Sequence, residues 1–77
     1  MEYRINVARL EVNGGRMRYV YLFCTKITGI FEAKRVYNEI KSKFTEPEYE
    51  VSLEVWEHSG REVNAEEYFN KEGWKND

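Results

Sequence analysis

The sequence has one cysteine, Cys24, and one histidine, His58, among its 77 residues. A single cysteine cannot form an intramolecular disulfide, and a zinc site needs three or four cysteine or histidine ligands in paired spacings. Nucleophilic catalysis needs a serine or cysteine held against a base that a third group orients, and no such combination can be assigned here. We therefore expect no catalytic residue, no metal and no cofactor.

The chain also lacks a long apolar run. It contains no stretch of 18 apolar residues, and its first residues alternate polar with apolar side chains instead of forming a signal-peptide core. A lone cysteine fits a reducing compartment better than a secreted disulfide scaffold. These absences predict a cytoplasmic protein without a membrane segment.

Aromatic residues, by contrast, are abundant: six Tyr, four Phe and two Trp, a content typical of folded domains. The formal net charge of −2 hides an asymmetry, because residues 1–44 carry nine Lys or Arg against four Glu, whereas residues 45–77 carry three against ten acidic residues. We expect the basic half to pack beside the acidic half. Mimicry of nucleic acid by the acidic half stays open.

A β-hairpin is predicted around Asn13-Gly14-Gly15, because glycine and asparagine supply the positive φ that tight turns need. A Gly14-Gly15 loop pairs Val12 with Met17, Leu10 with Tyr19 and Ala8 with Tyr21 on one face, and Glu11 then opposes Arg18. In that register the other face carries an aliphatic set suited to a core, namely Ile5, Val7, Val20, Leu22 and Cys24.

The rest of the chain predicts a helix, a strand and a short second helix. Thr28 or Gly29 caps a helix that ends near Phe44, with one apolar stripe of Ala33, Val36, Tyr37, Ile40 and Phe44. Residues 49–58 alternate like a half-buried strand, and residues 59–61 turn the chain. Asn64 and Glu67 have the spacing of a capping box, Gly73 is placed to end the second helix, and residues 75–77 are expected to fray.

This order predicts a single α+β domain over residues 1–77. We expect a three-stranded, mainly antiparallel sheet in ββαβ order, with one long helix on one face and a short carboxy-terminal helix beside it. The other face then carries Leu10, Met17, Tyr19, Tyr21, Phe23 and Trp56. Either the last segment, with Val63, Tyr68, Phe69 and Trp74, folds over this surface, or the surface docks on a partner or a second copy of the chain.

Two functions of different class follow from these patterns. In the first, the chain is a non-catalytic protein-binding module that uses Met17, Tyr19, Tyr21, Phe23 and Trp56 with an acidic rim that includes Glu50 and Glu54, and that forms a homodimer or binds a larger protein. In the alternative, Arg9, Arg16 and Arg18 contact the phosphates of single-stranded nucleic acid while hairpin aromatics stack on its bases. The sequence pI of about 5.5 argues against the alternative.

The segments 31–44 (FEAKRVYNEIKSKF), 49–57 (YEVSLEVWE) and 60–63 (GREV) resemble small uncharacterised phage and prophage proteins. Those proteins share an amino-terminal hairpin, a helix with an Ala-x-x-x-Tyr motif and an alternating strand that ends in Trp. The resemblance implies no activity and no site residues. It implies an accessory protein that acts in a host cytoplasm and binds, inhibits or redirects a host nucleic-acid-handling enzyme or defence system.

Overall fold

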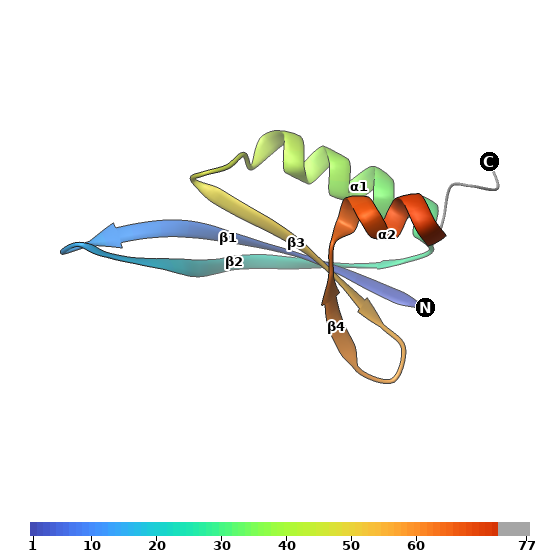
Figure 1. Cartoon of the computed structure of the whole chain (residues 1–77). Helices are drawn as coiled ribbons and strands as arrows, with labels where there is room; N and C mark the ends of the chain where they lie inside the picture. Colours follow the sequence, from blue (N-terminus) through green and yellow to red (C-terminus); the bar gives the residue numbers. More distant parts are fainter. Residues whose placement is uncertain (73–77) are drawn as a thin grey trace.

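Two long strands begin the chain and form a twisted hairpin that two helices cover on one side (Figure 1). The computed structural model describes residues 1–72. Its elements are β1 (Glu2–Asn13), β2 (Arg16–Thr28), α1 (Ile30–Lys43), β3 (Tyr49–Trp56), β4 (Gly60–Val63) and α2 (Ala65–Glu72). The strands form one antiparallel sheet in the order β2-β1-β3-β4, so α1 carries the chain across β1 from one side of it to the other.

The prediction of a three-stranded sheet with one long helix is therefore wrong. The sheet has four strands, and α1 is 14 residues long. The missed strand β4 has only four residues and begins with Gly60, and it pairs with the end of β3, where Trp56 opposes Gly60 and Leu53 opposes Val63. A segment this short, with a glycine at its start, resembles a turn in its sequence.

The first hairpin has the predicted register near its turn. Gly14 and Gly15 both have positive φ, at 59° and 81°, as a tight two-residue turn requires. Val12 opposes Met17, Leu10 opposes Tyr19, and Glu11 opposes Arg18. These predicted pairs are confirmed.

The register changes further along β2. Val7 opposes Phe23 but Ala8 opposes Tyr21, so Leu22 is an extra residue in a β-bulge. Because the bulge breaks the alternation of β2, Cys24 lies opposite Asn6 on the uncovered face, and Leu22 is 41% exposed. The prediction that Leu22 and Cys24 belong to the core is therefore wrong.

The core lies between the sheet and the two helices. Its buried residues are Tyr3, Ile5, Val7, Ile27, Leu53 and Val55 from the sheet, Ala33 and Tyr37 from α1, and Ala65 and Phe69 from α2. Val36 and Ile40 pack against this cluster, which confirms the predicted stripe on α1. The predicted alternation of residues 49–58 is confirmed as far as Trp56, because Val51, Leu53 and Val55 oppose Val7, Ile5 and Tyr3 of the core face. The strand ends at Trp56, two residues before the predicted end.

Helix α2 packs on the same side of the sheet as α1. The rings of Tyr37 and Phe69 meet edge to face with centroids 5.9 Å apart, and Tyr68 meets Tyr3 at 6.0 Å. The Asn64 side chain caps the helix by accepting a hydrogen bond of 3.0 Å from the Glu67 N–H. The alternative that Tyr68 and Phe69 fold over the uncovered face is therefore wrong, and the predictions for Gly73, Trp74 and residues 75–77 lie outside the described residues.

Candidate functional site

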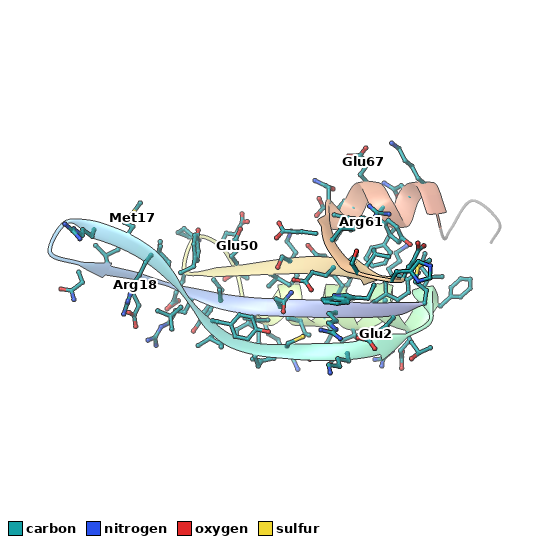
Figure 2. The ribbon with its side chains drawn as sticks, turned by 90° about the horizontal axis from the view of Figure 1, so that it is seen from below. Glu2, Met17, Arg18, Glu50, Arg61 and Glu67 are labelled. Carbon is teal, nitrogen blue, oxygen red and sulfur yellow. The ribbon has the colours of Figure 1, made fainter. Side chains whose placement is uncertain are left out.

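The sheet face turned away from α1 and α2 is the candidate functional site, and we call it the open face. Directly opposed residues share a face of a sheet, and neighbours along a strand alternate. The strand registers therefore assign to the open face Glu2, Arg4, Asn6, Ala8, Leu10 and Val12 of β1, Met17, Tyr19, Tyr21, Cys24 and Lys26 of β2, and Glu50, Ser52, Glu54 and Trp56 of β3. Figure 2 views the molecule from this side, with α1 behind the strands and α2 beside them.

At one end of the open face, the side chains of a polar cluster bind one another through hydrogen bonds and a cation–π contact. The Arg4 Nε donates a hydrogen bond of 2.5 Å to Glu2, and the Arg4 guanidinium lies 3.8 Å from the centroid of the Trp56 ring. The Trp56 Nε1 donates to a Glu54 carboxylate oxygen at 2.7 Å. The hydrogen bond from Arg4, with its positive charge, holds the pKa of Glu2 below its ordinary value.

Gly60 completes this cluster from the neighbouring strand. A Cβ at position 60 would collide with the Trp56 indole, so the ring occupies the space over the glycine. Trp56 is half-buried, with Arg4 against its ring and Glu54 on its nitrogen. Neighbouring groups of the same chain therefore cover much of the Trp56 ring.

In the middle of the open face, Tyr21 of β2 forms a side-chain hydrogen bond with Asn6 of β1. The Tyr21 hydroxyl donates a hydrogen bond of 2.8 Å to the Asn6 side-chain oxygen, while Tyr21 remains 60% exposed. Partial desolvation of the phenol, followed by the nearby Cys24 thiol, raises the pKa of Tyr21 above its ordinary value. The hydrogen bond to Asn6 links the Tyr21 side chain of β2 to β1.

The other end of the open face lies on a projecting ribbon. Strand β3 pairs with β1 only from Glu2 to Arg9, so residues 10–13 and 16–19 form a two-stranded extension beyond the rest of the sheet (Figure 1). At roughly 3.4 Å per residue, four residues extend about 14 Å. An apolar row runs along the open side of this ribbon and continues at its base. We define it as Leu10, Val12, Met17 and Tyr19 on the ribbon, with Ala8 and Tyr21 at the base.

The apolar row is strongly exposed. Val12 is 66% exposed, Met17 70% and Tyr19 53%. Large apolar side chains at these exposures lie next to one another on the open side of the ribbon, because Val12 opposes Met17 and Leu10 opposes Tyr19. No described residue of α1 or α2 covers them, since both helices pack on the other face (Figure 1).

The opposite side of the hairpin carries a cationic row, defined as Arg16 and Arg18 on the ribbon and Arg9 at its base, with Glu11 between Arg9 and Arg18. Arg9 and Arg18 both donate to the Glu11 carboxylate, at 3.0 Å and 3.4 Å. The hydrogen bond from Arg9, followed by desolvation and the hydrogen bond from Arg18, leaves the pKa of Glu11 below its ordinary value. Two of the three cations share the Glu11 carboxylate, so this side of the hairpin keeps a net positive charge. Met17 and Arg18 lie on opposite sides of the ribbon in Figure 2.

The structure brings some of the predicted binding residues together and separates others. Met17, Tyr19 and Tyr21 share the apolar row, whereas Trp56 lies at the far end of the open face. Phe23 does not belong to the open face, because it opposes Val7 on the helix side, where its ring meets Phe44 with centroids 5.5 Å apart. The bulge at Leu22 is the reason, because it reverses the face of every residue after it.

The two glutamates of the predicted acidic rim lie on the same face as Trp56, as predicted. Glu50 and Glu54 lie on the open face, opposite Ala8 and Arg4, but the Glu54 carboxylate accepts a hydrogen bond from Trp56. Sequence reasoning missed Val12 as a site residue, although its predicted pairing with Met17 placed it there. It also missed the stacking of Arg4 on Trp56, which depends on the pairing of β1 with β3.

Two features are absent from the described part of the chain, a metal-binding group of side chains and a membrane-spanning helix. Residues 1–72 contain no group of three or more His, Cys, Asp or Glu side chains arranged to hold a metal ion. None of the helices described is both long enough and apolar enough to cross a membrane. The open face is thus the main surface feature from which a function can be argued.

Comparison with protein-family models, with curated proteins and with solved structures finds no match for this chain. The resemblance to small phage and prophage proteins, and the host context that it implies, stay predictions.

Proposed function

We propose that this chain is a non-catalytic protein-binding module that docks through the apolar row of its open face. The observation that carries the proposal is the exposure of Val12, Met17 and Tyr19 side by side on a ribbon that projects from the sheet, with exposed Tyr21 next to them at its base. Apolar surface exposed in this way is costly for a small domain unless a partner covers it. Tyrosine and methionine are also enriched in the cores of protein interfaces.

The rest of the open face supports this role by holding the ribbon's base in place. Tyr21 is tied to Asn6, and Trp56 is enclosed by Arg4, Glu54 and Gly60. A surface whose rings are already oriented loses less side-chain entropy when it binds. The ribbon is therefore the part that contacts the partner, and the polar cluster is its fixed support.

The nucleic-acid alternative fits the structure less well. It requires the arginines to reach phosphates while tyrosines stack on the bases of the same strand. Arg9, Arg16 and Arg18 lie on the side of the ribbon opposite Tyr19 and Tyr21, and Arg9 and Arg18 already share Glu11. A protein partner on the apolar row would contact only one side of the ribbon, so the position of the arginines on the other side does not matter.

The proposal is tested with the variant Tyr19→Ser, Tyr21→Ser and the matched control Phe31→Ser, since Phe31 is a 60% exposed apolar residue on α1. Purified chains are compared by size-exclusion chromatography with light scattering, and tagged chains by affinity capture from the cell of origin. We expect a dimer or a captured protein with the wild type and the control, and loss of it with the tyrosine variant. Equal behaviour of all three chains, or recovery of nuclease-sensitive nucleic acid, would contradict the proposal.

A further inference from the structure

The outer edge of β2 has no partner strand among the described residues. The strand order places β2 at one side of the sheet with β1 as its only described neighbour, and β2 is 13 residues long. The other edge of the sheet is the four-residue strand β4. In an antiparallel sheet, alternate residues of an edge strand direct their N–H and C=O groups outward, so β2 offers a long template for an added strand.

Along residues 16–21, the side chains on one side of the edge strand include two arginines and those on the other side are apolar. Arg16 and Arg18 belong to the cationic row, and Met17, Tyr19 and Tyr21 belong to the apolar row on the other side of the strand. Side chains of an added strand would also alternate between the two sides. One set of its side chains would meet arginines, and the other set would meet apolar groups.

The charge of β2 is entirely positive. Its sequence, RMRYVYLFCTKIT, contains Arg16, Arg18 and Lys26 and no carboxylate. Glu11 of β1 is already shared by Arg9 and Arg18, and Arg16 forms no ion pair with any side chain described between residues 1 and 71. This edge therefore carries an excess of positive charge, which carboxylates of a partner would complement.

The strand that already pairs with β2 shows which chemistry fits. Leu10, Glu11 and Val12 of β1 oppose Tyr19, Arg18 and Met17, so an apolar, acidic, apolar sequence occupies the inner edge. An added strand on the outer edge meets the same two rows of β2 side chains. A second copy of β2 would instead bring further cations and no carboxylate.

We propose that residues 16–21 of β2 bind an extended acidic segment of a partner protein, in which carboxylates alternate with apolar side chains, by adding it as a fifth strand. This inference rests on the proposed function and specifies the partner's binding segment. The bulge at Leu22 sets the limit of the site, because an extra residue interrupts the regular spacing that strand pairing needs.

The test uses two labelled eight-residue peptides, one in which Glu alternates with Val and Tyr and one in which Lys replaces each Glu. Fluorescence anisotropy is expected to show saturable binding of the Glu peptide and at least tenfold weaker binding of the Lys peptide. The variant Arg16→Glu, Arg18→Glu should reverse this preference, whereas the control Arg61→Glu, an exposed charge on β4, should not. Equal binding of both peptides, or no binding of either, would overturn the proposal.

Strand pairing itself is tested by N-methylation of alternate amides of the Glu peptide. Only one set of alternate N–H groups faces β2 in a strand pair. Methylation of that set should abolish binding, and methylation of the other set should leave it within about threefold. If both methylated peptides bind like the parent peptide, edge pairing is wrong.

Failure of the edge site can be told apart from failure of the proposed function. Loss of the complex in the Tyr19→Ser, Tyr21→Ser chain, together with no effect of N-methylation, contradicts the edge site alone. A complex unaffected by the tyrosine variant contradicts the docking surface on which the edge site rests.

Discussion

Phe23 packs edge to face against Phe44, with ring centroids 5.5 Å apart, on the helix-covered side of the sheet. Tyr21, two residues earlier, lies on the open face and donates a hydrogen bond to Asn6. In a regular strand, residues two apart share a face. The bulge at Leu22 between them therefore decides which aromatic side chains stabilise the fold and which are free to bind.

Substitution of Phe23 tests this division of roles. We expect Phe23→Ala to lower the free energy of unfolding by about 2 kcal/mol, less than for a fully buried Phe because Phe23 is 36% exposed. Tyr19→Ala removes a 53% exposed ring and should change stability by less than about 0.5 kcal/mol. Urea unfolding of the two variants provides the comparison, and a larger loss for Tyr19→Ala would be inconsistent with the assigned faces.

Deletion of Leu22 tests the bulge directly. Without this residue, Tyr21 still opposes Ala8 and Phe23 still opposes Val7, so the ladder becomes regular and every side chain keeps its face. We expect a folded protein whose unfolding free energy changes by less than about 1.5 kcal/mol. Deletion of Ser52, which pairs regularly with Asn6, should unfold the chain because it moves half of β3 to the wrong face. Circular dichroism and urea unfolding measure both, and an unfolded Leu22 deletion would refute the bulge.

Gly60→Ala tests the packing of Trp56. The added Cβ collides with the indole, so the ring must move away from Arg4 or the β3–β4 hairpin must distort. We expect a loss of about 1–3 kcal/mol in unfolding free energy, typical of overpacking. Ser59→Ala, at the exposed neighbouring position, is the control. Urea unfolding measures both variants, and an unchanged stability of Gly60→Ala would show that the indole does not occupy this space.

Two carboxylates of the sheet contribute to the pH dependence of stability. Arg4 lowers the pKa of Glu2, and Arg9, with Arg18, lowers that of Glu11, both from an ordinary value of 4.5. A depressed folded-state pKa contributes stability above the unfolded-state value and loses it as pH falls through the folded-state value. We expect the urea midpoint to fall between pH 5.5 and pH 3, and to fall less in the variant Glu2→Gln, Glu11→Gln. An equally steep fall in that variant would exclude these two pairs as a cause.

The sequence predicts the tip of the hairpin well because one local signal controls it. Asn13, Gly14 and Gly15 fix the turn, and the turn fixes the pairs of Val12 with Met17 and Glu11 with Arg18. The faces beyond Leu22 were not predictable in the same way, because nothing in the residue type of a leucine marks a bulge. Strand register and packing against α1 decide its position.

Long-range packing accounts for the other differences. The short strand β4 depends on its pairing with β3, and the position of α2 depends on the contacts of Tyr68 and Phe69 with Tyr3 and Tyr37. None of these contacts is visible as a periodic pattern in eight or fewer residues. The open face was expected from the sequence. Only the structure shows that Phe23 lies on the other face and that Trp56 packs against Arg4.

Site-specific photo-crosslinking tests the docking surface most directly. A benzophenone amino acid is placed at position 19, in the apolar row, or at position 38, an exposed asparagine on α1. After irradiation in the cell of origin, and with the purified chain alone, the account predicts a discrete protein adduct or a covalent dimer from position 19 and none above background from position 38. No adduct at position 19, or equal yields from the two positions, would contradict a protein-binding open face.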